Sequence, residues 1–261
     1  MKLENRTAII AGGARGIGGA TAELFIANGA NVVIGDLLEE DGQALADKLG
    51  DKAIFSRLDV TDEAGWADMV KLAEDSFGGL DILVNCAGIL SFGGIADIPS
   101  DEIRRTLDVN LFGTIIGTQA VIPALRKRGA GAIVNISSSD GLTASNGHAA
   151  YVASKWGVRG FTKAAALELG LENIRVNSIH PGGVYTPLAN HRGVSREEFD
   201  KNFVLYAAQR GCDPEEIAQG VLYLSCDDSR YCMGSELAID GGLTAGHYYF
   251  GVPGAPDIKL G

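Results

Sequence analysis

Seven short runs of apolar residues, separated by longer segments of helical character, constrain the fold of this chain more than any other feature of its sequence. The runs are rich in Val and Ile, are apolar at consecutive positions, and most end in Gly, Asn, Asp or Ser. Strands that are apolar on both faces are typical of a parallel sheet covered by helices on both sides. The first residues of the seven runs are Thr7, Asn31, Ala53, Asp81, Gly131, Ile174 and Glu236. We therefore predict an α/β fold in which each run is one strand.

The segments between the runs carry signals of helix ends. The tetrapeptide "DPEE", from Asp213, combines an N-cap aspartate, a proline in the first turn and a glutamate three residues on, which predicts a helix start. Residues 100–128 form a long helical stretch that ends at Gly129, a suitable C-cap, and Pro123 should kink or shorten it. Right-handed helical crossovers then give a single domain over residues 1–261, a Rossmann-type doubly wound sheet of seven mostly parallel strands with helices on both faces.

Residues 183–212 fit neither the strand nor the helix pattern and interrupt the regular alternation. They contain at most two short helices. An insertion at the carboxyl ends of strands is a common place for a substrate-binding lid, which is one prediction for this segment. A purely structural excursion is an equal alternative.

Composition narrows the class of protein. Hydrophobic residues make up 46% and charged residues 21% of the chain, the balance of a globular protein with a large core. The formal net charge of −11 disfavours nucleic acid and anionic membranes as partners. No apolar run is long enough to predict a membrane span, and a strand from Thr7 leaves no room for a leader peptide. Four cysteines without CxxC spacing predict reduced thiols, so we expect a cytoplasmic protein.

A glycine-rich turn, "AGGARGIGG", directly follows the first run and opens a helix. Gly12, Gly16 and Gly18 permit a tight turn and let backbone N–H groups approach a pyrophosphate at the positive end of the helix. The spacing is GxxxGxG rather than the GxGxxG of the standard fingerprint, so the turn alone is weak evidence. Its position between a strand and a helix predicts a dinucleotide-binding site.

Asp36 and Arg15 bear on the choice of dinucleotide. Asp36 ends the second run, where a carboxylate can accept hydrogen bonds from both adenosine ribose hydroxyls. Its charge would repel the 2′-phosphate of NADP, whereas Arg15 in the turn could pair with that phosphate. We expect Arg15 to form an ion pair or to meet solvent, and we predict NAD as the cofactor.

A tyrosine and a lysine four residues apart, in "YVASKWG", indicate acid/base chemistry. Tyr151 and Lys155 would share one face of a helix, and a lysine beside a phenol lowers its pKa from about 10 toward the range of a general acid/base. Two surface residues would show the same spacing. Ser138, upstream at the end of "GAIVNISS", places a hydroxyl donor at the carboxyl edge of the sheet.

Four motifs in this order, "GGARGIG", "NCAG", "NISSSDG" and "YVASKWG", resemble the short-chain dehydrogenase/reductase family over almost the whole chain. The resemblance implies that Tyr151 is the acid/base for an alcohol, that Ser138 binds the substrate oxygen, and that Lys155 lowers the tyrosine pKa and holds the nicotinamide ribose. Asn110, in "DVNLFG", matches the asparagine whose backbone carbonyl holds a water on a proton relay to Lys155. These four residues are the predicted catalytic set.

The resemblance also implies a cofactor site along the sheet edge. Asp59 and Val60 match the pair at the adenine, and Thr186 matches a partner of the nicotinamide carboxamide. Cys86 stands where a second asparagine is common, and we expect only a packing effect from it. The implied cofactor-binding residues are Gly12, Arg15, Gly16, Ile17, Gly18, Asp36, Leu37, Asp59, Val60, Asn85, Ala87, Gly88, Tyr151, Lys155, Pro181, Gly182, Val184 and Thr186.

The motifs say less about the substrate. Most candidate pocket residues are apolar and indicate a bulky secondary alcohol, although a core or interface role is the alternative for each one. The candidates are Leu90, Phe92, Asp140, Leu142, His148, Tyr185, Leu188, Phe203, Leu205 and Tyr206. Asp140 would disfavour anionic substrates if it faces the cleft. The chain is similar to bacterial family members that act on hydroxysteroids and cyclic terpenoid alcohols, which implies a borneol-type alcohol first and a hydroxysteroid second.

Two other functions stay open. An NADPH-dependent reductase of β-ketoacyl groups on a carrier protein would find a basic patch at residues 126–128, although Asp36 and the acidic surface disfavour it. A non-catalytic NAD-binding sensor would be expected to lack part of the Ser/Tyr/Lys set. We expect His180, His191 and His247 to be structural or solvated, and no metal is predicted.

Assembly is predicted from the resemblance alone. Family members of this length are usually homotetramers, paired through helices that here begin near Ser100 and Ala149. The aromatic and apolar tail, residues 245–261, is predicted to pack on a neighbouring subunit.

Overall fold

The computed structural model describes residues 1–257 and contains one sheet of seven strands in the order β3-β2-β1-β4-β5-β6-β7. All neighbouring strands pair in parallel. The strands are β1 (Thr7–Ala11), β2 (Asn31–Asp36), β3 (Ala53–Arg57), β4 (Ile82–Asn85), β5 (Gly131–Ile136), β6 (Ile174–Pro181) and β7 (Glu236–Ile239). Each predicted run forms one strand, so the predicted doubly wound sheet is confirmed. The sheet is wholly parallel, where a mostly parallel one was expected.

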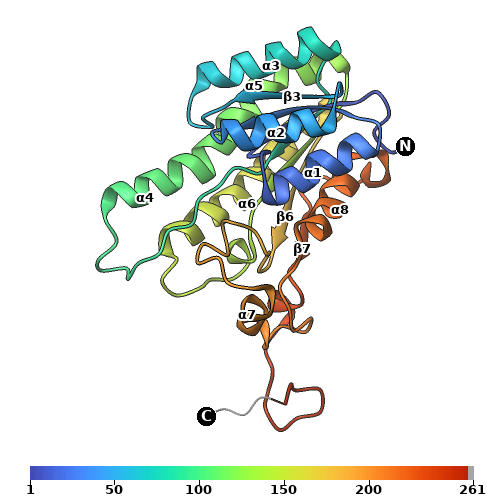
Figure 1. The fold of residues 1–261 in the computed structure, drawn as a ribbon. Helices are drawn as coiled ribbons and strands as arrows, with labels where there is room; N and C mark the ends of the chain where they lie inside the picture. The colour runs from blue at the N-terminus through green and yellow to red at the C-terminus, as the bar shows by residue number, and fades with distance from the viewer. Residues whose placement is uncertain (258–261) are drawn as a thin grey trace.

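Two layers of helices cover the sheet (Figure 1). The helices are α1 (Gly16–Ala27), α2 (Glu39–Leu49), α3 (Glu63–Phe77), α4 (Ser100–Leu107), α5 (Gly113–Arg128), α6 (Ala149–Leu169), α7 (Arg196–Asp200) and α8 (Pro214–Ser225). Helices α1, α2 and α8 pack on one face, and α3, α5 and α6 pack on the other. The start of α8 has the predicted capping box, with Asp213 and Glu216 bonding to each other's backbone.

The sheet has a hydrophobic core on each of its two faces, and this explains the continuous apolar pattern of the strands. In β1, Ile9 points into the core beneath α3 and α5, whereas Ile10 points into the core beneath α1 and α8. Both side chains are fully buried. Burial of each such side chain contributes about 1.5–3 kcal/mol. Because every interior strand has to supply both cores, alternation between apolar and polar residues is absent.

The long helical stretch between β4 and β5 is interrupted, but not at Pro123. Helix α5 continues through Pro123 to Arg128 and ends at Gly129, which is left-handed with φ +74°. Pro123 therefore does not shorten the helix, and the predicted alternative, a kink, stays a prediction. The irregularity lies earlier, in a widened π-helical turn at Asp108–Phe112. This turn holds Asn110, whose side chain bonds to the backbone of Ile89 after β4.

The stretch Ser100–Arg128 is also the one helix within residues 1–257 with the length and hydropathy of a membrane span. Core helices of globular proteins can have the same length and hydropathy, and 44% of the most apolar 18-residue stretch of this helix is buried inside the fold. Its α5 part packs on α3, β4 and β5, which accounts for its apolar residues. The absence of a membrane-spanning segment stays a prediction.

The insertion between β6 and α8 contains α7 and a short 3-10 turn, Lys201–Phe203. A bridge between Val184 and Cys212 closes its base. Arg196 ties the insertion together, because its guanidinium pairs with Asp200 and Asp213. In Figure 1 this segment lies beyond the carboxyl ends of β6 and β7.

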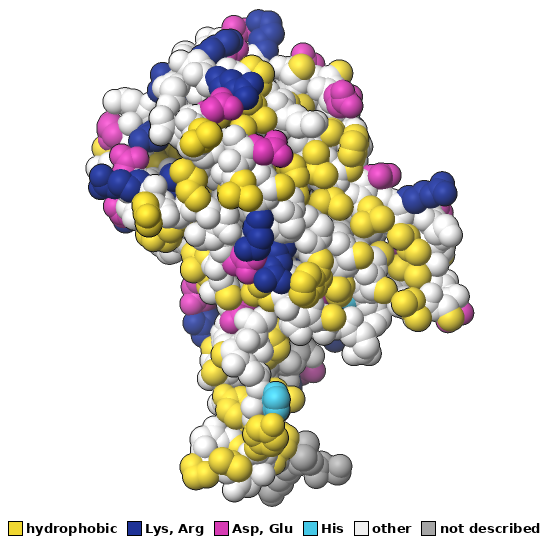
Figure 2. All heavy atoms as spheres, turned by 180° about the vertical axis from the view of Figure 1, so that it is seen from behind, with side chains coloured by type: hydrophobic (Ala, Val, Ile, Leu, Met, Phe, Trp, Pro, Cys, Tyr) yellow, Lys and Arg dark blue, Asp and Glu magenta, His cyan; other side chains and the backbone are white. Residues whose placement is uncertain are grey.

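The tail after β7 extends away from the body of the molecule (Figure 1). Its side chains are apolar and exposed: Tyr249 is 70% exposed and Val252 57%. Figure 2 shows hydrophobic side chains gathered on this tail. Residues 258–261, which belong to the predicted interface segment 245–261, lie outside the described residues. Packing of the tail on a neighbouring subunit stays a prediction.

Candidate active site

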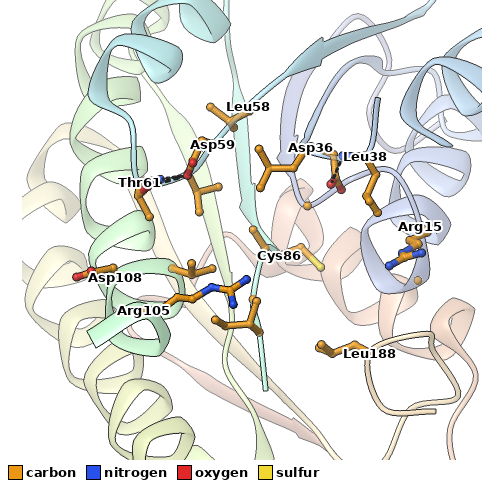
Figure 3. Close-up of a pocket in the computed structure, with 18 of the residues that line it drawn as sticks. Arg15, Asp36, Leu38, Leu58, Asp59, Thr61, Cys86, Arg105, Asp108 and Leu188 are labelled. Carbon is orange, nitrogen blue, oxygen red and sulfur yellow. Dashed lines mark hydrogen bonds between the residues drawn. The ribbon is translucent and has the colours of Figure 1, made fainter. Parts of the chain in front are cut away.

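A large cavity of about 1110 Å³ opens at the carboxyl ends of β1, β2 and β4, where the strand order reverses (Figure 3). In open α/β sheets this reversal is the ordinary place for a ligand. Of the predicted cofactor residues, those that line the cavity are Gly12, Arg15, Gly16, Ile17, Asp36, Leu37, Asp59, Val60, Ala87, Gly88 and Thr186.

The glycine-rich turn between β1 and α1 has no room for a side chain at Gly12 or at Gly18. A Cβ on Gly12, which has φ +77°, would lie 2.5 Å from the backbone nitrogen of Ala87. A Cβ on Gly18 would lie 2.0 Å from the carbonyl oxygen of Gly12. The bare backbone of the turn therefore borders the cavity directly, as a site for a pyrophosphate requires.

Asp36 closes the β2 end of the cavity, and its carboxylate is fixed by the backbone. It accepts hydrogen bonds from the N–H groups of Ala14, at 3.0 Å, and Leu38, at 3.1 Å. Arg15 does not pair with Asp36. Its guanidinium lies 3.7 Å from Asp41, and about half of its side chain is exposed. The residues present thus fit a dinucleotide whose adenosine ribose meets a carboxylate.

A second wall of the cavity consists of residues that the sequence motifs did not predict. Residues of α4 and the π-helical turn lie opposite Asp36 and Arg15, and Figure 3 shows Arg105 on this side. Their side chains approach the cavity only because the chain crosses over after β4, which no local pattern records. The lining residues absent from the predicted set are Leu38, Leu58, Thr61, Cys86, Ile89, Asp101, Arg104, Arg105, Asp108, Val109, Phe112 and Pro187.

Some predicted cofactor residues stand behind the lining instead. Gly18 packs on Gly12, as described above. Asn85 is buried and donates to the amide oxygen of Asn135 at 2.9 Å, so it joins β4 to β5. Gly182 packs closely against Asp240. The other predicted residues outside the lining are Pro181, Val184, Tyr151 and Lys155.

Cys86 lines the cavity, and burial raises the pKa of its thiol to about 12. The thiol therefore stays protonated at neutral pH. This agrees with a packing role rather than a reactive one.

Ser138 and Tyr151 meet at the carboxyl end of β5. Ser138 caps a short 3-10 turn, and its hydroxyl accepts the N–H of Asp140 at 3.1 Å. Its carbonyl oxygen lies 3.0 Å from Nδ1 of His180, a fully buried histidine on β6. His180 is therefore structural, as predicted. A hydrogen bond from the Ser138 hydroxyl acts to lower the pKa of Tyr151.

Tyr151 and Lys155 lie one turn apart on α6, as predicted. Burial raises the pKa of Tyr151 to about 12, opposed by the hydrogen bond with Ser138 and reinforced by the charge of Asp140. The ammonium of Lys155 lies 5.6 Å from the centre of the Tyr151 ring and donates to the carbonyl oxygen of Ile136 at 2.9 Å.

Burial also lowers the pKa of Lys155 to about 8. The ammonium of Lys155 is therefore mostly charged at neutral pH and begins to lose its proton just above neutral pH. In this structure desolvation raises the pKa of Tyr151 and the ammonium of Lys155 is directed to a backbone carbonyl, so the lowering of the tyrosine pKa by lysine stays a prediction.

Asn110 is buried and connects three elements. Its side-chain oxygen accepts the N–H of Ile89 at 2.8 Å, and its amide donates to the hydroxyl of Ser154 on α6 at 3.1 Å. The backbone carbonyl that the family resemblance assigns to a water accepts the hydroxyl of Thr114 at 2.9 Å. A carbonyl has a second lone pair, so this bond leaves one acceptor position.

The predicted substrate residues separate into two groups. Near Tyr151, the ring of His148 lies 6.2 Å from the tyrosine ring and 4.8 Å from that of Phe92. Asp140 is buried and bonds to His148. The ring of the exposed His191 lies 5.4 Å from that of Phe92 and is tilted by 49°.

The other group forms the core of the insertion. Phe203 is 9% exposed and packs between Phe199 and Tyr206, so it does not line an open pocket. Tyr185 donates its hydroxyl to the carbonyl of Val194 and packs on Phe199.

The predicted leucines belong to neither group. Leu188 lines the dinucleotide cavity instead of a separate substrate pocket. Leu90 and Leu142 are half-buried, and Leu205 is 54% exposed. Apolar residues of a lid core and of a pocket look alike in a sequence, which explains these differences.

Within residues 1–257, no group of three or more His, Cys, Asp or Glu side chains could hold a metal ion. The prediction that the protein needs no metal is not tested by this observation.

A parallel sheet with a glycine-lined cavity at its reversal point is the arrangement of a dinucleotide-binding protein, and the hydrogen-bonded Ser138 and Tyr151 add a pair of hydroxyl groups that can handle a proton. A family model described as enoyl-(acyl carrier protein) reductase matches residues 12–244. The chain belongs to the short-chain dehydrogenase/reductase family, whose dehydrogenases use a nicotinamide cofactor.

Similar proteins are dehydrogenases of cyclic alcohols and hydroxysteroids. The chain is 44% identical to trans-4-hydroxycyclohexanecarboxylate dehydrogenase of Sinomonas cyclohexanicum, over 94% of this chain and 95% of the relative. It is 44% identical to 3-alpha-(or 20-beta)-hydroxysteroid dehydrogenase of Mycobacterium tuberculosis, over 96% and 94%. It is 40% identical to cyclopentanol dehydrogenase of Comamonas testosteroni, over 94% and 99%.

Proposed function

We propose that this protein is an NAD-dependent dehydrogenase that interconverts a cyclic secondary alcohol and its ketone, with Tyr151 as the general acid/base. The observation that carries the proposal is the hydrogen bond of Ser138 with Tyr151, one helical turn from Lys155, whose ammonium lies 3.6 Å from the Cβ position of the cavity-lining Gly88. The nicotinamide would accept or return a hydride at the carbinol carbon. The residues of the chain handle the proton and the orientation of the substrate.

Ser138 orients the substrate oxygen. Its hydroxyl is held by the N–H of Asp140 and can donate to an alkoxide or a carbonyl oxygen. Tyr151 takes the proton of the alcohol during oxidation and returns it during reduction. Because its pKa is raised to about 12, the phenol is the resting form at neutral pH. Reduction therefore starts from the abundant protonated state, whereas oxidation needs the scarce phenolate.

NAD is proposed over NADP because a fixed carboxylate stands at the ribose end of the cavity. Asp36 is held by two backbone N–H groups and cannot easily swing away from a 2′-phosphate. Arg15 is engaged by Asp41.

The substrate class is supported by the relatives and by the side chains around Tyr151. The names of all three relatives describe dehydrogenation of a hydroxyl group on a compound that contains a carbon ring. Phe92, which is 53% exposed, offers an apolar surface to such a ring. We propose a borneol-type terpenoid alcohol as the first candidate and a hydroxysteroid as the second.

The experiment is a screen of ring alcohols with NAD and with NADP, followed by absorbance of the reduced nicotinamide. We expect oxidation of borneol, cyclohexanol or a hydroxysteroid with NAD preferred. Absence of turnover with every alcohol and both cofactors would refute the proposal and favour a non-catalytic NAD-binding protein.

A reductase of carrier-bound β-ketoacyl groups is less well supported than the sequence indicated. The basic residues that could meet an acidic carrier are already paired: Arg126 with Glu172, Lys127 with Glu74, and Arg128 with Asp81. The screen should include a β-ketoacyl thioester with NADPH to separate the two functions.

We further propose a cytoplasmic homotetramer that binds neither nucleic acid nor membranes. Exposed leucines in the last turn of α6 and in the 3-10 turn after it support an interface there, because Leu167 is 82% and Leu171 95% exposed. Analytical ultracentrifugation tests this assembly, and a monomer would contradict it.

A further inference from the structure

Asp140 and His148 form a pair beside Tyr151 that the acid/base chemistry does not use. Asp140 is 6% exposed, and its Oδ2 lies 3.3 Å from Nδ1 of His148. Its Oδ1 accepts the hydroxyl of Ser145 at 2.7 Å. Two partners thus fix the carboxylate, and the carboxylate in turn fixes one edge of the imidazole.

The other ring nitrogen of His148 has no such partner. Within residues 1–257, no hydrogen bond involves its Nε2, and 24% of the side chain is exposed. The ring stands edge-on to Phe92, at an interplanar angle of 87°, and to Tyr151, at 90°. The unpaired nitrogen therefore belongs to a side chain that is held in one orientation beside the proposed acid/base.

This pair also acts on Tyr151 at a distance. The negative charge of Asp140 is one of the causes that raise the pKa of Tyr151. The distance of 6.2 Å between the ring centres of His148 and Tyr151 places the pair next to the proposed acid/base.

The geometry points to His148 as a specificity-determining residue that hydrogen-bonds through Nε2 to a second oxygen of the substrate, with Asp140 as its positioning residue. This inference rests on the proposed alcohol dehydrogenase function. With Nδ1–H donated to Asp140, a neutral imidazole accepts a hydroxyl hydrogen at Nε2, and an imidazolium donates to a carbonyl or carboxylate oxygen. The substrate class is a ring alcohol that carries another oxygen function across the ring.

A plain hydrocarbon ring makes a poorer substrate for this arrangement. It would cover Nε2 without bonding to it, and an unpaired buried polar atom costs free energy. The order of the proposed substrates therefore changes: borneol, which carries a single oxygen, should be oxidised less efficiently than a ring alcohol of similar size with a second oxygen, such as a hydroxysteroid with a further oxygen function.

The test compares two probes, cyclohexanol and trans-cyclohexane-1,4-diol, by the ratio of their kcat/KM values with NAD. For the wild-type protein we expect a ratio of about ten or more in favour of the diol, the effect of one hydrogen bond to a polar site. In His148→Phe, which keeps an aromatic ring, the ratio should fall to about two, the factor left by the two equivalent hydroxyls of the diol. His247→Phe, in the exposed tail, is the matched control and should keep the wild-type ratio.

Asp140 is tested with the same ratio. Asp140→Ala should lower it as far as His148→Phe does, whereas Asp140→Asn keeps an oxygen for Nδ1–H and should retain part of the preference. A general loss of stability affects both probes equally and leaves the ratio unchanged.

The outcomes separate the two levels of the proposal. If the wild-type protein oxidises both probes and the ratio in His148→Phe stays within about two-fold of the wild-type ratio, the inference is overturned and the dehydrogenase function stands. If the wild-type protein oxidises neither these probes nor any other ring alcohol, the proposed function fails, and this inference fails with it.

Discussion

The two halves of the cleft differ in what holds their residues in place. In the dinucleotide half, the key positions stand at the ends of strands and are fixed by backbone contacts, as in the turn at Gly12 and the carboxylate of Asp36. In the substrate half, side chains on loops hold one another, as in the Asp140–His148 pair and the cluster around Phe203. Substitutions in the first half should therefore act on cofactor binding, and those in the second on substrate selection.

The largest effect is expected where the two halves meet. Tyr151→Phe removes the proposed acid/base and should lower kcat by about 10²–10⁴-fold while nucleotide affinity stays close to that of the wild type. Steady-state rates and fluorescence titration with NADH measure the two quantities. Tyr185→Phe also loses a hydroxyl, but one bonded to Val194, so this control should keep most activity. A Tyr151→Phe variant with normal kcat would contradict the assignment.

The second-largest effect is expected from a side chain added to the glycine-rich turn. In Gly18→Ala the new methyl would lie 2.0 Å from the carbonyl oxygen of Gly12, so the turn must shift, and nucleotide affinity should fall about 100-fold or more. Gly160→Ala is the matched control, because no atom of the described residues lies within 4 Å of its Cβ position. Calorimetric titration with NADH gives both affinities. Equal affinities in the two variants would show that the turn does not approach the nucleotide.

The pH dependence probes the boundary between the halves. Because the pKa of Tyr151 is raised to about 12, the phenolate fraction increases about ten-fold per pH unit, and kcat/KM for alcohol oxidation should rise with this slope from about pH 6 to 8. Above about pH 8 the rise should weaken as Lys155, whose pKa is lowered to about 8, loses its charge. Ketone reduction should stay nearly flat below pH 8. A flat oxidation profile would mean that the base is ionised well below its expected pKa.

A smaller effect is expected on the preference for NAD over NADP, measured as the ratio of the two kcat/KM values. Asp36→Asn removes the charge that opposes a 2′-phosphate and should shift the kcat/KM ratio toward NADP by about ten-fold or more. Asp47→Asn, on the exposed side of α2, should leave the ratio unchanged. An unaltered ratio in Asp36→Asn would place the selection at another residue.

The smallest effect is expected from the insertion. Arg196→Ala breaks pairs with Asp200 and Asp213, and a looser insertion should raise KM for the alcohol by about three-fold without a change in KM for NAD. Lys201→Ala breaks only an exposed pair with Glu198 and serves as the control. Equal changes in both KM values would mean that the insertion is structural and not a lid.

The sequence predicted the dinucleotide half well because strand ends are local features. Asp36 and Ser138 each end an apolar run, and this alone locates them at one edge of a parallel sheet. The wall containing Arg105 was missed because its place depends on how α4 crosses the sheet. Phe203 was assigned to the pocket because burial inside the insertion and exposure to a substrate give the same apolar residue.

Charge was also harder to predict than position. The spacing of Tyr151 and Lys155 placed both on α6, but the direction of the tyrosine pKa depends on desolvation and on the carbonyl of Ile136, which receives the ammonium. Neither is visible in the four-residue spacing.

The widened turn at Asp108–Phe112 changes which side of α4 faces the same direction as a given side of α5. One extra residue in a helix rotates everything before it by about 100° relative to everything after it. The apolar residues of α5 can therefore stay on the sheet while Arg104 and Arg105 are aimed at the cavity. Deletion of a single residue in this turn would rotate the two arginines away from the cavity and leave the sheet and its cores in register.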